Sequence, residues 1–347
     1  MKIAVVGAGA IGGYVGGWLA AAGEDVTFIA RGANLAAIKQ NGMRVIGEDG
    51  AEIVTRPAVH ERTVDAGPQD YVILAVKAHQ VGAIAADVAA LCHADTAIVT
   101  MQNGIPWWYF HKHGGALEGT PVRAADPDGS IARAIHADRV IGSVVYPAAT
   151  LEAPGVVQVV EGRRFTLGEP DGSSSPRAQA ISAAFTRAGF KSPVIGDIRS
   201  EIWLKLWGNL SFNPISALTH STLAGLLRFP LTRELSVQMM REAETVANRL
   251  GVTFRVGIDK RIAGAEKVGE HKTSMLQDVE AGRPLELEAL IGAVVELGRL
   301  TETPTPHIDA VYALVSLLAN QLGQTKGRLS LPPSPTFSDQ SKSVQMA

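Results

Sequence analysis

The sequence lacks cysteine pairs, because its 347 residues include a single cysteine, Cys92. One cysteine excludes an internal disulfide and any metal site built from a cluster of cysteines, and it is consistent with a reducing compartment. His111 and His113 lie close together in the chain. No carboxylate or thiol near them has a spacing typical of metal ligands, so we predict no metal site.

The chain also lacks an excess of charge of either sign. Its formal net charge is -2 at pH 7, and 19% of its residues are charged. Such a balance gives no electrostatic footprint for nucleic acid or for an anionic membrane surface. With 46% hydrophobic residues the composition is that of a soluble globular protein, and the length is sufficient for two domains.

One stretch without charge, residues 3–23, follows a lysine and therefore resembles a signal peptide or a membrane span. The six glycines from Gly7 to Gly17 are too dense for a stable membrane helix, and their spacing has another explanation. We therefore expect a cytoplasmic protein without a membrane or nucleic-acid partner.

A glycine motif follows the first predicted strand and opens a helix of small residues that ends near Ala22. The motif, Gly7-Ala-Gly9-Ala-Ile-Gly12, has the G-x-G-x-x-G spacing. Its first glycine permits a tight turn, the second lets the backbone approach a pyrophosphate, and the third packs the helix against the strand. The free N–H groups at the start of the helix attract phosphate. Because a strand precedes it and a helix follows it, the motif predicts dinucleotide binding.

The second predicted strand, residues 25–30, is followed by Arg31. An NAD site typically has an acidic residue here for the ribose hydroxyls, whereas the 2′-phosphate of NADP favours arginine. The nearest acids, Glu24 and Asp25, lie at the start of the strand instead. An exposed loop arginine is the alternative interpretation, but the position favours NADP(H) as the cofactor.

Two later strands, residues 70–77 and 96–102, also end in polar side chains. Lys77 closes the first, and Gln102 and Asn103 lie at the end of the second. Ligands of doubly wound sheets bind outside the carboxyl ends of the strands, so these residues are candidates to contact cofactor or substrate. Capping and turn formation are the alternative, since Asn103-Gly104 is a favourable turn sequence.

The pattern of elements changes near residue 198. Before that point we expect further strands at residues 140–146, 155–160 and 164–168 and near Val194, a turn at Pro154-Gly155 and a helix at residues 178–188. After it we expect helices at residues 232–250 with Thr232 as the cap, 273–282, 285–300 and 308–322. The sequence predicts an α/β fold with an N-terminal Rossmann-type dinucleotide-binding domain, residues 1–198, and an all-α C-terminal domain, residues 199–328. The tail, residues 329–347, is rich in Ser and Pro and is predicted to be disordered.

Residues 105–137 combine an aromatic run at 106–110 with several turn signals. We interpret this segment as a mobile or partly apolar cover over the cofactor.

A helix predicted from residue 201 is apolar in nearly every direction, which indicates burial. Glu201, Lys205, Asn209 and Asn213 recur at intervals of four and therefore form one polar stripe. The stripe faces either bulk water or a cavity that receives a polar ligand. Asparagine is a poor helix former, which favours the cavity. Pro214 is expected to kink or end the helix after Asn213.

These motifs together resemble the ketopantoate reductase (2-dehydropantoate 2-reductase) family over nearly the whole chain. The residues that carry the resemblance are Gly7–Gly12, Arg31, Val76-Lys77-Ala78, Asn103-Gly104, the segment Lys205-Leu-Trp-Gly-Asn209-Leu-Ser-Phe-Asn213-Pro, and Thr273-Ser274-Met-Leu-Gln-Asp278. Members of this family reduce the keto group of 2-dehydropantoate with NADPH to (R)-pantoate, on the route to coenzyme A.

The resemblance implies roles for individual residues. Lys205 would be the general acid, a role that suits lysine because burial can lower its pKa toward the working pH. Asn103, Asn209, Asn213, Ser274 and Glu286 would bind the substrate, with Ser274 on its carboxylate and Glu286 on its hydroxyl. The predicted cofactor contacts are Gly7, Ala8, Gly9, Ala10, Ile11, Gly12, Arg31, Lys77 and Asn103.

Three departures from the family pattern concern the substrate. His271 replaces an asparagine, the segment after Gly104 is long and aromatic, and Glu286 and Glu288 both follow Pro284. The alternatives are therefore a paralogue that reduces another 2-oxo acid and a non-catalytic NADP(H)-binding sensor. The sequence leaves the oligomeric state open, with a homodimer as one option.

Overall fold

The computed structural model describes residues 1–329. A seven-stranded sheet forms the centre of the N-terminal half, with the strand order β11-β8-β7-β6-β1-β2-β5. Its strands are β1 (Lys2–Val6), β2 (Asp25–Ile29), β5 (Ala58–His60), β6 (Gln69–Leu74), β7 (Cys92–Thr100), β8 (Val140–Val145) and β11 (Phe165–Gly168). All neighbours are parallel except β8 and β11. The chain reverses direction across the sheet at β1, and the strand ends around such a point form the usual ligand crevice of this fold.

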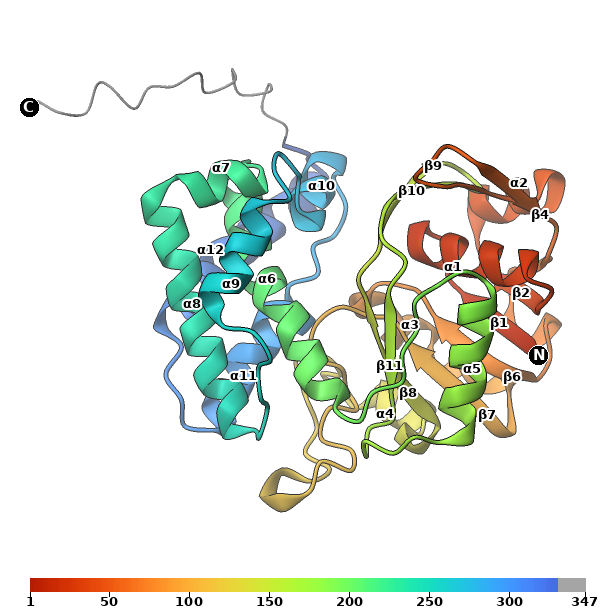
Figure 1. Cartoon of the computed structure of the whole chain (residues 1–347), viewed down its shortest axis with the longest axis horizontal. Helices are drawn as coiled ribbons and strands as arrows, with labels where there is room; N and C mark the ends of the chain where they lie inside the picture. The colour runs from red at the N-terminus through yellow and green to blue at the C-terminus, as the bar shows by residue number, and fades with distance from the viewer. Residues whose placement is uncertain (330–347) are drawn as a thin grey trace, which may run out of the picture.

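Helices cover both faces of this sheet, as Figure 1 shows. They are α1 (Ala10–Ala21), α2 (Gly32–Asn41), α3 (Ala78–Val88), α4 (Ser130–Ala134) and α5 (Pro176–Arg187), with short 3-10 turns η1 (Thr63–Asp65), η2 (Ala89–Leu91), η3 (Gly115–Leu117) and η4 (Ala137–Arg139). Alternate residues of β1 pack into different clusters: Ile3 and Val5 join the core under α1 and α5, whereas Ala4 and Val6 join the core under α3 and α4. This alternation is the period of two that a strand covered on both faces requires.

A second, four-stranded sheet packs on the outer face of α1. Its order is β4-β3-β10-β9, with β3 (Met43–Ile46), β4 (Glu52–Thr55), β9 (Ala148–Ala153) and β10 (Val156–Glu161). A Cβ atom added at Gly13 or Gly17 would lie 2.7 Å from a side chain of this sheet, and one at Gly16 would collide with Phe28 of the large sheet. The uncharged, glycine-rich stretch therefore contains most of β1 and the helix α1, which is held closely between two sheets. Among residues 1–329 no helix has both the length and the apolar character needed to cross a membrane, and the cytoplasmic location stays a prediction.

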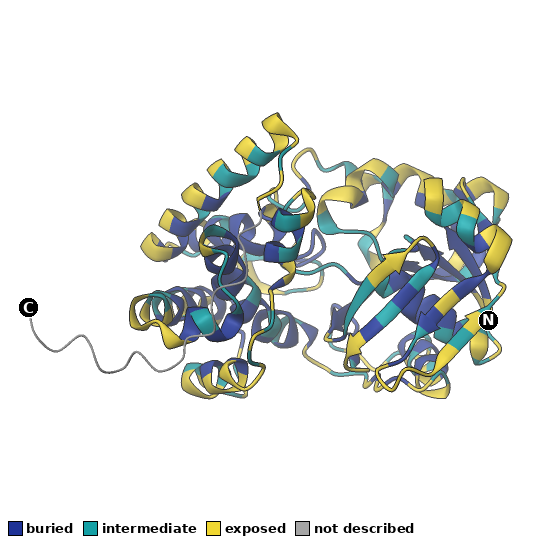
Figure 2. Cartoon of the chain, turned by 90° about the horizontal axis from the view of Figure 1, so that it is seen from above, coloured by how far each residue is buried: buried dark blue, intermediate teal, exposed yellow. Residues whose placement is uncertain are grey.

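The C-terminal half is helical (Figure 1). Its helices are α6 (Ile198–Thr219), α7 (Leu223–Arg228), α8 (Pro230–Arg249), α9 (Ile258–Glu266), α10 (Ser274–Ala281), the π-helical turn η5 (Glu288–Gly292), α11 (Ala293–Leu300) and α12 (Pro306–Thr325). Figure 2 shows buried residues in the interior of this half and exposed residues on the outside. The predicted fold class, a Rossmann-type domain followed by an all-α domain, is confirmed.

Helix α6 joins the two halves. Asp197 caps it by accepting a hydrogen bond of 2.9 Å from the N–H of Ser200. Ile198 packs on the large sheet at two glycines, since a Cβ at Gly168 would lie 2.8 Å from the Cβ of Ile198, and one at Gly142 would lie 3.0 Å from its Cγ1. Side chains larger than hydrogen at these two positions would push α6 away from the sheet.

Several predicted elements need correction. Thr232 does not cap α8, which begins at Pro230, a favoured residue at the first helical position. Of the two expectations for Pro214, the end of the helix after Asn213 is wrong, because α6 continues through Pro214 to Thr219, and the kink stays a prediction. The burial of α6 on all sides outweighs the lost backbone hydrogen bond. Near Val194 there is a single bridge to Leu167 rather than a strand. The predicted disordered tail lies outside the described residues from residue 330 onward.

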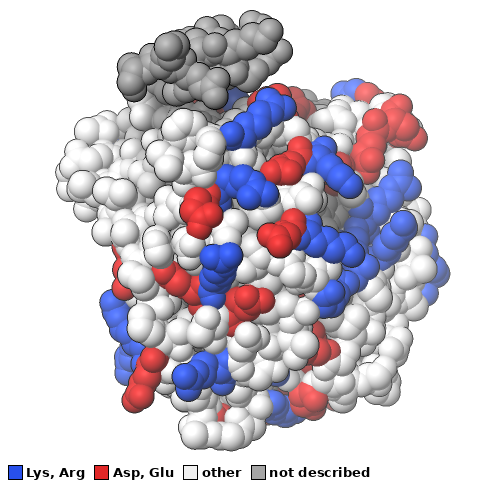
Figure 3. Space-filling model, turned by 60° about the vertical axis from the view of Figure 1, so that its left-hand side comes forward, with Lys and Arg blue, Asp and Glu red and all other residues white. Residues whose placement is uncertain are grey.

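Basic and acidic side chains are interspersed on the face that Figure 3 draws. This mixture agrees with the net charge of -2, and it gives that face no extended field of one sign.

Candidate active site

Lys205 lies on α6 where the helix crosses the carboxyl ends of β7 and β8. Its Nζ donates a hydrogen bond of 2.5 Å to Oδ1 of Asn103, and another to the carbonyl oxygen of Val145. Burial lowers the pKa of Lys205 to about 8, the charge of Glu286 opposes that shift, and the charge of Arg261 adds to it. The lysine is thus a fixed cationic donor whose proton is held less tightly than that of an exposed lysine.

Asn103 is positioned by the loop that leaves β7. Gly104 has a φ of +88°, and a Cβ there would collide with the backbone of Ala289 in η5. The N–H of Ile105 donates to the carbonyl of Ala289 at 2.8 Å. The loop therefore docks on the helical domain through a contact that only glycine permits.

A small cavity lies between the large sheet and α6 beside Lys205. Its polar lining comes from Thr100, Gln102, Asn103, Ser143, Lys205 and Asn209. Two members of the predicted stripe, Lys205 and Asn209, therefore line one cavity. Gln102 is held in place, because its amide nitrogen donates to the carbonyls of Leu74 at 2.8 Å and Val76 at 2.9 Å.

Farther along α6, Asn213 meets the start of α10. Its Nδ2 donates to Oγ of Ser274 at 3.4 Å, and Thr273 caps α10 by accepting from the N–H of Leu276. Ser274 is exposed, whereas Asn213 is buried. The structure therefore brings these two predicted substrate-binding residues together.

The two glutamates after Pro284 face different surroundings. Oε1 of Glu286 accepts a hydrogen bond of 3.1 Å from the N–H of Ala78 at the start of α3, and its charge acts on Lys205. Both carboxylate oxygens of Glu288 accept from the hydroxyl of Tyr312 on α12, at 2.7 and 2.8 Å. Of these two glutamates, Glu286 is the one whose charge acts on Lys205.

Lys77 crosses between the domains as well. It forms an ion pair with Asp278 of α10, whose other oxygen accepts from Arg283 at 2.7 Å. The side chain of Asp278 is 5% exposed, so this carboxylate is buried between two cations. The residue predicted to contact the cofactor is paired here with the helical domain.

A larger cavity, of about 400 Å³, opens at the carboxyl ends of β1 and β2. Its lining includes Gly7, Ala8, Ala30, Arg31, Asn34, Glu61, His79 and Gln80. A Cβ at Gly9 would meet nothing within 4 Å, so the backbone at the start of α1 borders open space. Gly12, in contrast, packs against the backbone of Gly7, and Ala10 and Ile11 form the first turn above it. The residues present therefore suit a dinucleotide whose pyrophosphate lies at this helix start.

Sequence reasoning missed Asn34, which shapes this cavity. Its Nδ2 donates to the carbonyl of Ala8 at 3.1 Å, and its Oδ1 accepts from the N–H of Gly155 at 3.0 Å. An asparagine three residues after Arg31 carried no distinguishing signal in the sequence, because its partners are remote.

Glu201 has the spacing of the polar stripe, but its side chain does not line the cavity beside Lys205. It is 5% exposed, accepts from the hydroxyl of Tyr146 at 2.8 Å and pairs with Arg255 at 2.9 Å. It therefore anchors the loop before α9 to α6, and the part of the stripe that lines the cavity begins at Lys205.

The aromatic run at residues 106–110 is buried, so the mobile cover is wrong, whereas a partly apolar cover stays a prediction. Trp107, Trp108, Tyr109 and Phe110 are all buried in the core that the two domains share. Arg199 of α6 donates to the carbonyls of Tyr109 and His111, at 2.8 and 2.6 Å. The segment forms a fixed support under α6.

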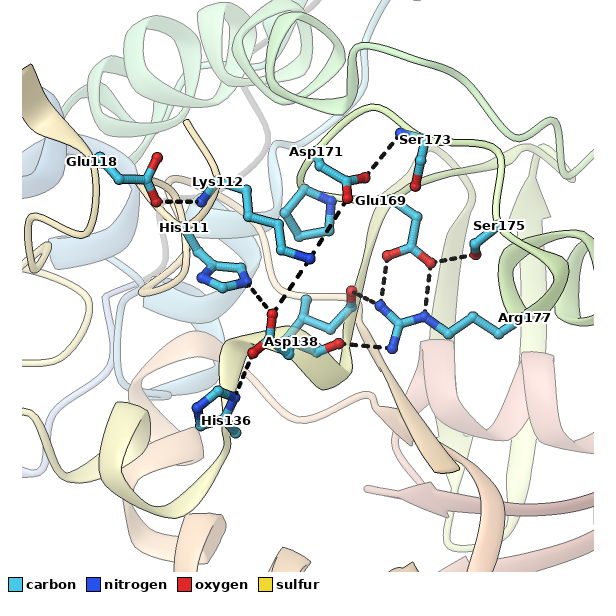
Figure 4. Close-up of polar contacts among 12 residues, drawn as sticks. His111, Lys112, Glu118, His136, Asp138, Glu169, Asp171, Ser173, Ser175 and Arg177 are labelled. Atoms are coloured by element: carbon cyan, nitrogen blue, oxygen red, sulfur yellow. Dashed lines mark hydrogen bonds and ion pairs between the residues drawn. The ribbon is translucent and has the colours of Figure 1, made fainter. Parts of the chain in front are cut away.

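The histidine after this run belongs to a surface cluster (Figure 4). Nε2 of His111 lies 3.0 Å from Oδ1 of Asp138, and Nδ1 of His136 lies 3.1 Å from Oδ2 of the same carboxylate. Arg177 joins the neighbouring Glu169 to the carbonyl of Asp138. These contacts fasten the 105–137 segment to the edge of the sheet.

The fold and the site define a dinucleotide-dependent oxidoreductase of two domains, in which a lysine of the helical domain meets the ligand edge of the Rossmann sheet. The family model described as "Ketopantoate reductase PanE/ApbA" matches residues 3–172, and "Ketopantoate reductase PanE/ApbA C terminal" matches residues 197–319. The chain belongs to the ketopantoate reductase family.

Individual relatives cover nearly the whole chain. It is 55% identical to the 2-dehydropantoate 2-reductase of Mesorhizobium japonicum, over 93% of this chain and 99% of that protein. The crystal structure of a putative ketopantoate reductase from Ralstonia solanacearum is 40% identical, has a TM-score of 0.87 and covers 94% of this chain and 99% of its own. A D-mandelate dehydrogenase solved with NADH and anilino(oxo)acetate shares the fold, with a TM-score of 0.79, at 22% identity, over 93% of this chain and 100% of its own.

Proposed function

We propose that this protein reduces 2-dehydropantoate to (R)-pantoate with NADPH, with Lys205 as the general acid. The observation that carries the proposal is the placement of Lys205, which is held by Asn103 and Val145 at the sheet edge with its pKa lowered to about 8. The relative from Mesorhizobium japonicum, which bears the name of this activity at 55% identity, supports the choice of substrate.

Reduction of the keto group requires a hydride, a proton and stabilisation of the negative charge on the keto oxygen. NADPH, when bound, supplies the hydride to C2 of the substrate. Lys205 stabilises the negative charge that develops on the keto oxygen and then donates its proton there. Asn103 and Val145 hold the ammonium in place, so little reorganisation is required during the reaction.

Substrate contacts are assigned to Asn103, Asn209, Asn213, Ser274 and Glu286. The hydrogen bond between Asn213 and Ser274, and the effect of the Glu286 charge on Lys205, support this set. In the same proposal residues 1–198 bind NADPH through Gly7–Gly12, Arg31 and Lys77, and residues 199–328 supply the acid and most substrate contacts.

The test is NADPH oxidation across a panel of 2-oxo acids, with NADH as the control cofactor. We expect the highest kcat/KM for 2-dehydropantoate with NADPH. Turnover with a different 2-oxo acid alone would identify a paralogue. Tight NADPH binding without any turnover would contradict the proposal and favour an NADP(H) sensor.

A further inference from the structure

The side chain of Asn34 joins two turns that are far apart in the sequence. Its Nδ2 donates to the carbonyl of Ala8 in the glycine motif, and its Oδ1 accepts from the N–H of Gly155 in the turn between β9 and β10. Exchanging the two ends of the amide would place donor against donor and acceptor against acceptor. The side chain is therefore held in one orientation at the border of the larger cavity.

The glycine motif is fixed at both ends by its own backbone. The N–H of Gly7 donates to the carbonyl of Ile29 at 3.0 Å, and a Cβ at Gly12 would collide with the carbonyl oxygen of Gly7. Between these two points, the carbonyl of Ala8 accepts from Asn34 and from no other group of residues 1–329. Asn34 is thus the contact that fixes the peptide bond between Ala8 and Gly9.

Without that contact the Ala8–Gly9 peptide could turn over at low steric cost, because Gly9 has no Cβ. The peptide is trans, so its C=O and N–H point in opposite directions. Gly9 immediately precedes α1, and its N–H has no partner in the part of the chain that the structure describes. An anion at a helix start is attracted by N–H groups and repelled by a carbonyl oxygen. The orientation of this peptide therefore matters to a bound pyrophosphate.

The two segments that Asn34 connects to the glycine motif have other contacts that hold them. The turn at Gly155 packs closely on α2, since a Cβ at Gly155 would lie 3.3 Å from the Cβ of Ala37. The carbonyl of Gly155 also accepts from the N–H of Arg44 in β3 at 2.9 Å. Loss of the Asn34 amide should therefore leave α2 and this turn in place and release the carbonyl of Ala8.

We propose that Asn34 is a positioning residue for the cofactor, which holds the Ala8–Gly9 peptide in the orientation that receives the pyrophosphate. Of the proposed function, the inference requires only dinucleotide binding. The pyrophosphate is common to NADPH and NADH, so Asn34 contributes equally to the binding of both. In this respect it differs from Arg31, whose proposed contact is the 2′-phosphate that NADPH alone carries.

The experiment measures the binding of three ligands to Asn34→Ala by fluorescence titration and by displacement of NADPH. The ligands are NADPH, NADH and adenosine 2′-monophosphate, which has the 2′-phosphate and no pyrophosphate. We expect the Kd of NADPH and that of NADH to rise by the same factor, about 3- to 10-fold, the usual effect of one lost hydrogen bond. The Kd of adenosine 2′-monophosphate should stay at the wild-type value. Arg31→Ala should show the opposite pattern, with NADPH and adenosine 2′-monophosphate weakened most.

Gln158→Ala is the matched control for a structural effect. The Nε2 of Gln158 donates to the carbonyls of Gly47 and Val159, at 3.2 and 3.0 Å, within the small sheet and away from the larger cavity. It should lose stability in urea unfolding as Asn34→Ala does, and bind all three ligands as wild type does. Asn34→Asp, which keeps the acceptor for Gly155 and removes the donor to Ala8, should also weaken NADPH and NADH. Adenosine 2′-monophosphate corrects for the added charge of this variant.

Each outcome decides the role of Asn34. Equal losses for NADPH and NADH with unchanged adenosine 2′-monophosphate support the inference, even if the protein reduces no 2-oxo acid, a result that would overturn the proposed function alone. A loss confined to the two ligands with a 2′-phosphate would show that Asn34 acts through Arg31. That result, equal losses for all three ligands, the same losses in Gln158→Ala, or unchanged binding would each overturn the inference and leave the proposed function intact.

Discussion

The surroundings of Lys205 make its proton easier to release, which suits the general-acid role that we propose for it. Burial and the charge of Arg261 lower its pKa to about 8, although Glu286 acts in the opposite direction. At this pKa the lysine is mostly protonated at neutral pH and can still lose the proton within a catalytic cycle.

Reduction by the wild-type protein should therefore decline as the pH rises through about 8, where Lys205 loses its proton. In Glu286→Gln the same limb should move to lower pH, because the opposing negative charge is gone.

Lys205→Ala should lower kcat by roughly 10²–10⁴ while NADPH binding survives. Rates across pH 6 to about 10 check these expectations, and a pH profile in Lys205→Ala with the wild-type limb would contradict the role of Lys205.

Arg31 raises a separate question at the same scale, the choice between NADPH and NADH. It follows β2, starts α2 and borders the larger cavity, where Glu61 also lies. Arg31→Ala should weaken NADPH binding by about tenfold or more and NADH binding much less, since only NADPH carries the 2′-phosphate. Fluorescence titrations with the two cofactors measure the difference. Equal losses would count against the 2′-phosphate contact.

At the scale of elements, local patterns were sufficient to predict much of the candidate site. The glycine motif and the polar stripe of α6 each depend on spacing within one segment, which a sequence displays directly. Glu201 and the aromatic run at 106–110 could not be interpreted this way, because Glu201 meets Arg255, 54 residues away, and Tyr109 meets Trp203, 94 residues away.

The close contact between Gly104, in the loop after β7, and Ala289 can be tested by substitution. Gly104→Ala adds a Cβ that collides with Ala289, in addition to the cost of a left-handed conformation, which is about 1–2 kcal/mol. Gly114→Ala is the matched control, since Gly114 has a φ of +77° and a Cβ there would meet nothing within 4 Å. Urea unfolding should show the larger loss in Gly104→Ala, together with a lower kcat. Equal losses in the two variants would contradict the docking role of Gly104.

At the scale of the whole molecule, polar contacts join the domains across the site. Lys77 pairs with Asp278, the N–H of Ala78 donates to Glu286, and the N–H of Ile105 donates to Ala289. All of these donors follow strands of the large sheet, and all of the acceptors belong to the helical domain. The relative position of the domains therefore depends on residues at or beside the proposed cofactor and substrate contacts.

A double-mutant cycle measures the coupling free energy of one of these contacts, the ion pair between Lys77 and Asp278. Lys77→Met and Asp278→Asn should show a coupling of about 0.5–3 kcal/mol in the free energy of unfolding, because the two side chains are in contact. Lys77→Met and Glu280→Gln should be additive within about 0.5 kcal/mol, because Glu280, on the same helix, pairs with Lys272 instead. Additive effects for Lys77 and Asp278 would show that the ion pair does not hold the domains together.

The hydrogen bonds that Lys205 and Glu286 make within the protein have a consequence for turnover. A substrate that binds these groups must displace Asn103, Val145 or Ala78 as their partners, so binding is an exchange of internal for external hydrogen bonds. When the product leaves, both side chains can re-form their hydrogen bonds with these internal partners. Internal competition of this kind weakens ground-state binding and product binding alike, which favours rapid release over tight retention.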